Sequence, residues 1–353
     1  MMTRKSASGS SWNSRVAVET RSNSLEQVDD RLSIHEFDAP QVMPGPMAAP
    51  HRRHEACVPS RPVQLRPNAF VLVPALNFGC GRLAELRVEP PVTPEQWCEL
   101  RPCVFFGDFV FNEPLGSLLV FALAALWIVA GVRFLRDARG QQSRRWFGVA
   151  LVLGGGGAAL AGISYQAFSY MLKCAGEAHC RLTNGFEVGY SVLQALSVSA
   201  MLLAIAYACV HGRPRRLIVA YAAINAIAYA LVSAAGVMLP SRSLLSFEVL
   251  SLFALPPAVL VIALAAKSLT TSARALDRSL LISAVFLLLV QAAHFAYAAA
   301  GLTERLWRNG RGFYFSANDV LHAGMIAWLV WVVAALGPEL RDRDGIGREG
   351  EEA

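Results

Sequence analysis

Seven apolar stretches, each close to the length of a membrane span, constrain this chain more than any other feature. A helix needs about 20 mainly apolar residues to cross the hydrocarbon core of a bilayer. Backbone groups in lipid must be bonded within their own segment, so runs of this length predict helices rather than barrel strands. The stretches are Gly116–Leu135, Trp146–Leu172, Phe186–Val210, Leu217–Leu239, Leu244–Ala266, Leu280–Leu302 and Tyr314–Leu336. They predict an all-α bundle of seven transmembrane helices.

The distribution of charge supports this prediction. Only 16% of the 353 residues are charged and 54% are hydrophobic, whereas a soluble domain carries about 25% charged residues. Nearly all charges lie before residue 115, in short connectors or after residue 337, as expected because a charge at the bilayer centre costs about 2.5–3.5 kcal/mol. The pattern predicts a multi-pass protein of the inner (plasma) membrane, with the lipid bilayer as its partner. The basic residues form no aromatic-interleaved patch, which argues against a nucleic-acid partner.

Composition divides the chain into three parts. Residues 1–95 are rich in Ser, Arg and Pro and lack periodicity, which predicts a disordered basic segment. Residues 96–337 form the predicted seven-helix membrane domain. Residues 338–353 are a short charged tail.

Arginine and lysine in the connectors predict the orientation. The connectors after the first, third and fifth spans carry eleven of these residues, and those after the second, fourth and sixth carry six. The positive-inside rule then places the N-terminus outside and the C-terminus in the cytoplasm. This orientation requires export of about 115 residues without a signal sequence. Either that segment stays inside, or the true translation start lies further along the chain; we favour the second explanation.

The cysteines agree with this orientation. Cys174 and Cys180 lie in the connector after the second span, which is predicted to face an oxidising compartment. A disulfide between them is permitted, although a spacing of six residues does not decide it. Cys209 lies in an apolar span and is expected to be a small buried hydrophobe.

Ionisable residues inside the predicted spans are few, and intramembrane charges often mark functional sites. They are Glu187, Glu248, His294, Asp319 and His322, all toward the predicted outer face. Asp319 and His322 are three residues apart and share one helix face. We predict that both point into the bundle toward His294. With Glu187 or Glu248 they would form a metal site or a base with its orienting partner. Alternatively, these residues only hydrogen-bond the helices together.

Three short motifs resemble a known superfamily. They are Trp97-Cys98-Glu99, Glu113-Pro114 and Asn318-Asp319-Val320-Leu321-His322. They are similar to segments of the superfamily that joins alkaline ceramidases, adiponectin/progestin-type receptors and bacterial relatives. The resemblance implies seven helices with calcium at Glu99 and Glu113. Its hydrolytic members hold zinc with a histidine in the second span and an HxxxH pair in the seventh, where this chain has Gln166 or Phe168 and Ile326.

Two functions therefore stay open. The first is a metal-dependent, hydrolase-like protein acting on a lipid or amphiphile at the outer face. Asp319 and His322 would be its catalytic candidates, and a divalent metal such as zinc would be held by residues among Glu187, His294, Asp319 and His322. The alternative is a non-enzymatic membrane sensor, transporter or assembly factor that uses the same residues to bind a ligand or protons.

Overall fold

The computed structural model describes residues 80–271, 274–307 and 312–343. Within these residues, seven helices are long and apolar enough to cross a membrane. They are α3 (Pro114–Arg136), α4 (Gln142–Ala161) with the π-helix η3 (Gly162–Ala167), α6 (Gly185–Cys209), α7 (Gly212–Met238), α8 (Phe247–Thr271), α9 (Ala275–Ala299) and α11 (Ala317–Trp331) with the π-helix η5 (Val332–Leu336). Every predicted span is thus confirmed as a helix. The ends differ by a few residues.

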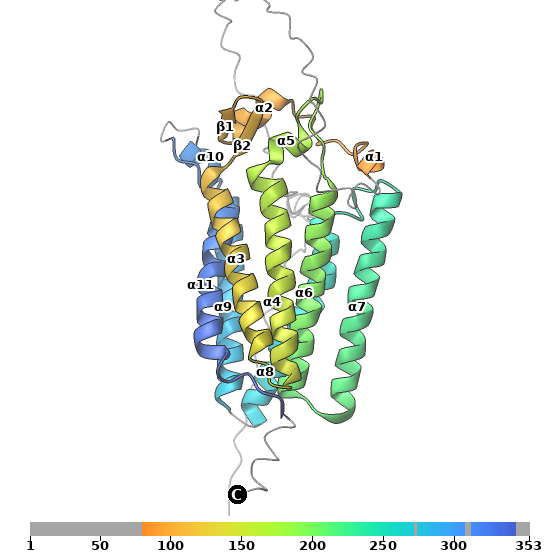
Figure 1. Ribbon diagram of the computed structural model, residues 1–353, viewed down its shortest axis with the longest axis vertical. Coiled ribbons are helices and arrows are strands. Elements are labelled where there is room, and N and C mark those ends of the chain that lie inside the picture. Colours follow the sequence, from red (N-terminus) through yellow and green to blue (C-terminus); the bar gives the residue numbers. More distant parts are fainter. Residues whose placement is uncertain (1–79, 272–273, 308–311, 344–353) are drawn as a thin grey trace, which may run out of the picture. The chain divides into compact units, whose positions relative to one another are not determined.

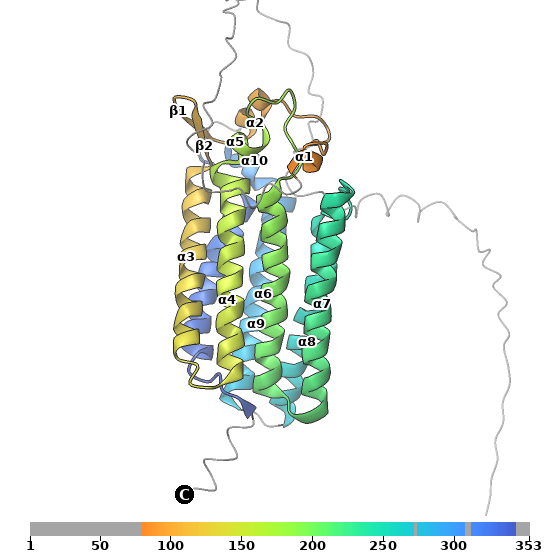
Figure 2. The same cartoon turned by 45° about the vertical axis from the view of Figure 1, so that its right-hand side comes forward.

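Short elements gather at one end of the bundle (Figure 1, Figure 2). They are α1 (Cys80–Leu83), α2 (Pro94–Leu100), the strands β1 (Cys103–Phe106) and β2 (Phe109–Asn112), α5 (Ser169–Lys173) and α10 (Leu302–Leu306). The strands form an antiparallel hairpin that pairs Cys103 with Asn112 and Phe106 with Phe109. We call these elements the cap, and the end that they cover the cap end. The opposite end, which carries residues 337–343, is the tail end.

Local sequence signals explain where several helices begin at the cap end. Pro114 occupies the first turn of α3, where its fixed φ suits a helix and its missing N–H is not needed. The Asn184 side chain accepts hydrogen bonds from the first backbone N–H groups of α6. Ser316 and Asp319 form a reciprocal capping box at the start of α11. Several polar residues near this end therefore serve to cap the first turns of helices.

Two disulfides occur among the described cysteines. Cys98–Cys103 joins α2 to β1, and Cys174–Cys180 closes the loop that follows α5. The second pair is the one that the sequence permitted. Trp97 packs on Cys174 and Cys180 in a small buried cluster. Cys209 is a buried free thiol, which confirms its expected character.

The predicted boundary at residue 95 differs from the structure. Residues 1–79 of the segment predicted to be disordered lie outside the described residues. Residues 80–95, however, carry α1 and the start of α2. Val88 N donates to the carbonyl of Cys180, and Leu182 N donates to the carbonyl of Leu86. The chain is ordered here because these backbone groups pair with the loop after α5, a contact that local composition does not encode.

Close contact at glycines brings α3 and α4 together. A methyl group at Gly154 would lie 2.1 Å from the Trp127 ring, so only glycine fits there. Small residues permit such approach between membrane helices, whose association depends on packing. Trp127 in turn lies 5.8 Å from the Trp328 ring of α11. The main apolar cluster draws on residues of α3, α4, α6, α8, α9 and α11, and α6 is the most buried of these spans.

Candidate functional site

Glu187 lies in the first turn of α6 and belongs to a buried ion pair. Its Oε1 lies 2.6 Å from Lys173 Nζ and accepts a hydrogen bond from Ser164 Oγ at 2.7 Å. Asn184 Nδ2 donates to the same Ser164 oxygen at 2.6 Å. The side chains of Lys173 and Glu187 are 7% and 5% exposed. The cation of the cap thus offsets the charge of Glu187, which the sequence offered as a metal ligand.

His294, Asp319 and His322 lie on α9 and α11, which pack against each other. His294 Nδ1 is 2.9 Å from the carbonyl oxygen of Ala317. Because a carbonyl only accepts, Nδ1 carries the hydrogen in this contact. His322 Nδ1 is buried and makes no hydrogen bond to the described residues. His294 and His322 are close enough to interact electrostatically.

A shared metal site gains no support from this arrangement. Within residues 80–271, 274–307 and 312–343, no group of three or more His, Cys, Asp or Glu side chains is placed to hold a metal ion. The main packing partners of α6 are α4, α7 and α8, whereas α11 packs on α9 and α3. Glu187 and Asp319 therefore lie on helices that are not main packing partners, although both approach η3. Glu248 is exposed at the start of α8.

Asp319 instead approaches residues of α3 and η3. Its Oδ2 accepts a hydrogen bond from Ser316 N at 2.7 Å, and the residue is fully buried. A Cβ built on Gly116 would lie 2.8 Å from Asp319 Oδ1, 3.5 Å from Glu113 Oε2 and 3.4 Å from Gln166 Cγ. Three side chains thus converge on one glycine, whose missing Cβ leaves room for them. We call Glu113, Gln166 and Asp319 the carboxylate cluster.

The cap supplies the positive charge beside this cluster. Arg101 Nη1 lies 3.3 Å from Glu113 Oε1, and the hydroxyl of Tyr314 donates to the same oxygen at 3.2 Å. The Arg101 guanidinium stacks 4.1 Å from the Trp97 ring, and Lys173 Nζ lies 5.8 Å from that ring. Trp97 therefore contacts the cations of both buried ion pairs, and the cap and the helix ends form one electrostatic unit.

Gln166 adds a buried amide to the cluster. The residue is 3% exposed, and its Oε1 is buried without a hydrogen bond from the described residues. Buried polar atoms are normally paired, and leaving one unpaired costs about 1–3 kcal/mol. The cluster therefore combines two carboxylates with a buried amide oxygen that lacks a donor among the described residues.

The cavity nearest to Glu187 is small. Its volume is about 50 Å³, and Tyr165, Glu187, Tyr190 and Leu250 are among the residues that line it. Ligand pockets of drug-sized molecules have volumes of roughly 300–1,000 Å³. The cavity therefore has room for water rather than for a lipid chain.

Sequence reasoning missed the partners of the acidic residues. Arg101 and Lys173 lie outside the predicted spans, so a search for ionisable residues within the spans does not find them. The one available signal was the pair of apolar quartets Cys103–Phe106 and Phe109–Asn112 around a two-residue turn, a pattern that favours a hairpin. Recognising that hairpin would have placed Arg101 directly above the start of α3.

No protein-family model, curated protein or solved structure matches this chain.

Proposed function

We propose that this chain is a non-enzymatic membrane protein, of the sensor or transporter type, that binds a proton at the cap end of the bundle. The proton would be held in the carboxylate cluster, between Glu113 and Asp319. The observation that carries the proposal is the convergence of two carboxylates and one amide on Gly116. Seven apolar helices around this cluster are compatible with a polytopic membrane protein.

Two properties of the cluster favour uptake of a proton: the repulsion between its carboxylates and a buried acceptor without a donor among the described residues. Two carboxylates in a buried site repel each other when both are ionised, so such a pair readily shares one proton. Protonation of either group also adds an O–H donor to a site in which Gln166 Oε1 accepts no hydrogen bond from the described residues. Ionisable groups at such depth commonly serve proton relays.

Groups on neighbouring elements would respond to that proton. Arg101 and Tyr314 contact Glu113 from the cap and from the segment before α11. Tyr297 of α9 interacts electrostatically with Asp319, and its hydroxyl donates to the carbonyl of Phe315. Uptake of a proton would therefore alter contacts between the cap, α9 and α11, which is how a buried site influences a larger structure.

Infrared difference spectroscopy on the purified full chain tests the proposal. The wild type should show a protonated-carboxyl band whose intensity changes with pH, and Asp319→Asn or Glu113→Gln should remove or shift that band. Glu248→Gln changes an exposed carboxyl group of α8 and should leave the band unaltered. A spectrum without a titrating carboxyl band, or one in which only Glu248→Gln has an effect, would refute proton binding at this cluster.

The metal-dependent hydrolase implied by the resemblance is the competing prediction. Its direct test is the metal content of detergent-purified protein. Stoichiometric zinc that disappears in His322→Ala while the protein stays folded would favour the hydrolase and count against our proposal.

A further inference from the structure

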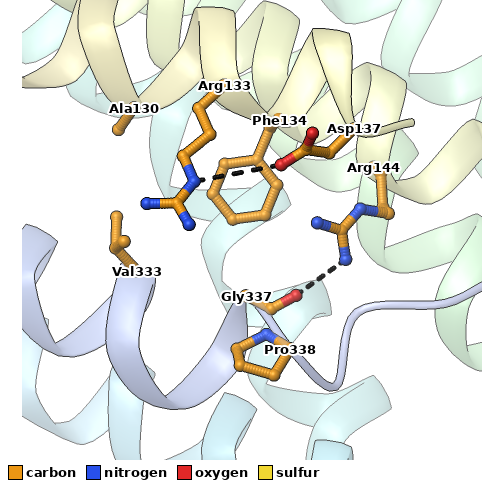
Figure 3. Close-up of a pocket in the computed structure, with 8 residues that line it drawn as sticks. All are labelled: Ala130, Arg133, Phe134, Asp137, Arg144, Val333, Gly337 and Pro338. Carbon is orange, nitrogen blue, oxygen red and sulfur yellow. Dashed lines mark hydrogen bonds and ion pairs between the residues drawn. The ribbon is translucent and has the colours of Figure 1, made fainter.

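A cavity lies at the tail end of the bundle, far along the helices from the carboxylate cluster. It is formed where α3 ends, α4 begins and η5 gives way to the tail, and its volume is about 180 Å³. Cavities of about 150 Å³ can hold a benzene-sized ligand. Figure 3 shows Arg133 and Arg144 reaching toward the cavity with the Phe134 ring between them, and Gly337 and Pro338 across from them.

Arg144 is a partly buried cation that the tail and the Phe134 ring hold in place, and some of its N–H groups make no hydrogen bond to the described residues. Its Nη1 donates to the carbonyl of Gly337 at 2.9 Å, and its guanidinium lies 5.4 Å from the Phe134 ring. Nη1 also lies 3.5 Å from the carbonyl oxygen of Leu340, whereas Nη2 makes no hydrogen bond to the described part of the chain. Guanidinium groups present five N–H donors in a planar fork, a shape that matches phosphate oxygens. The geometry thus leaves a donor for an anion.

Arg133 supplies a second cation that is free to turn. Its side chain is 75% exposed, and its Nε lies 3.9 Å from Asp137. Such a long, exposed ion pair contributes little to stability and does not fix the orientation of the Arg133 guanidinium. Arg139 and Arg341 also interact electrostatically with Arg144. Two arginines, Arg133 and Arg144, line the cavity against one aspartate, Asp137, so the lining carries an excess of one positive charge.

The tail holds the site together and occupies the neighbouring helix end. Both carboxylate oxygens of Asp342 accept hydrogen bonds from the first backbone N–H groups of α4, from Gln142 N at 2.8 Å and Ser143 N at 2.7 Å. The helix N-terminus therefore already has its anion. A further anion would be bound by the arginine side chains rather than by the helix end.

We propose that this cavity binds a phosphate group, either that of an anionic lipid or free phosphate. The position favours the lipid, because α3 and α4 are long and apolar enough to span a membrane, so their ends would lie at the headgroups, and basic pockets between membrane helices bind lipid phosphates. This site is independent of the carboxylate cluster, which lies at the other end of the same helices.

The binding test uses the purified full chain in zwitterionic detergent. Phosphatidylglycerol, phosphatidylcholine and inorganic phosphate are titrated separately, and binding is followed by native mass spectrometry and by the shift in Tm. Phosphatidylglycerol should bind and raise Tm, whereas phosphatidylcholine should not. Inorganic phosphate that displaces the lipid, or binds as tightly as the lipid does, would assign the site to free phosphate.

Variants locate the site. Arg144→Gln should weaken binding on the order of tenfold, the effect of losing one charge-assisted hydrogen bond. Arg133→Gln, which changes an exposed side chain and preserves folding contacts, should weaken it by roughly threefold. Arg216→Gln removes one exposed positive charge from the start of α7 and serves as the matched control. Equal affinity in Arg133→Gln and the wild type, or equal loss in Arg216→Gln, would overturn the proposal.

Discussion

Gly116 shows how one missing side chain can shape a buried site. Asp319, Glu113 and Gln166 all approach the position that a Cβ would occupy. Glycine is used here for the space that it leaves, since α3 is an ordinary helix at this residue. The carboxylate cluster therefore depends on the absence of a Cβ at residue 116. Replacing Gly116 with alanine adds only that carbon and is the mildest way to disturb the cluster.

We predict that Gly116→Ala destabilises the protein by about 1–3 kcal/mol, the usual cost of overpacking, because the new methyl group would lie 2.8 Å from Asp319 Oδ1. Thermal unfolding in detergent measures the effect. Gly156→Ala is the control: its Cβ would meet Leu193 at an ordinary 3.5 Å, and alanine favours helices. The control should be neutral or slightly stabilising, and equal losses in both variants would contradict the account.

Lys173 and Glu187 form a pair whose two members depend on each other. Removal of one partner leaves an uncompensated buried charge, which typically costs about 3–5 kcal/mol. Lys173→Met should therefore lower the free energy of unfolding by that amount, measured by chemical or thermal denaturation. The double variant Lys173→Met/Glu187→Gln should recover part of the loss.

The exposed Lys267 provides the control for this prediction. Lys267→Met removes the same charge from an exposed position of α8. If Lys173→Met is no more harmful than Lys267→Met, the buried ion pair contributes less than we argue.

Spacing within one helix was readable from the sequence, whereas partners on other elements were not. The i,i+3 relation of Asp319 and His322 follows from helix geometry alone, and Asp319 is indeed buried. The partner of Glu187 is Lys173, from α5 of the cap. Its position depends on how the cap folds over the helix ends, and no periodicity in the sequence carries that information.

At the scale of elements, the cap is fastened to the loop after α5 by charge as well as by backbone pairing. Glu177 accepts hydrogen bonds from Arg87, at 2.9 Å, and from Arg181. The hydrogen bonds from Arg181 and Arg87 lower the pKa of the Glu177 carboxyl below its ordinary value of 4.5. A carboxyl group whose pKa is lower in the folded than in the unfolded chain stabilises the fold at pH values above its unfolded pKa. That stabilisation is lost as the pH falls through the lowered pKa of the folded state.

We therefore predict a pH-dependent loosening of the cap. Backbone protection of Val88 and Leu182, whose N–H groups join the two segments, should be constant at neutral pH and should fall as pH drops below about 4.5. Hydrogen exchange corrected for the intrinsic pH dependence measures it. In Glu177→Gln the same amides should exchange faster already at pH 7. Unchanged protection across this pH range in the wild type would show that the ion pairs do not fasten the cap.

The long elements were predictable and the short ones were not. About 20 apolar residues leave a membrane span little choice of structure, so all seven helices followed from the sequence. The cap consists of pieces of four to seven residues, too short for periodicity to identify. Two local disulfides and backbone pairing with a distant loop hold them, and the distant pairing is not visible in a local window.

At the scale of the whole bundle, two polar regions lie at opposite ends of the same apolar helices. The cap end carries the disulfides, the carboxylate cluster and two buried ion pairs. The tail end carries the arginine-lined cavity. The connector charges predict that the tail end lies in the cytoplasm, and an oxidising compartment outside would suit the disulfides of the cap. This orientation determines which side of the membrane each proposed site would face.

Cysteine accessibility at the two ends of α3 tests that central claim most directly. Asp108 at the hairpin turn and Arg136 at the end of α3 are both exposed, so Asp108→Cys and Arg136→Cys are compared with the unsubstituted chain in intact cells. A membrane-impermeant maleimide should label Asp108→Cys directly and Arg136→Cys only after permeabilisation. Labelling of both residues from one side would show that α3 does not cross the membrane, and the reverse pattern would place the cap in the cytoplasm.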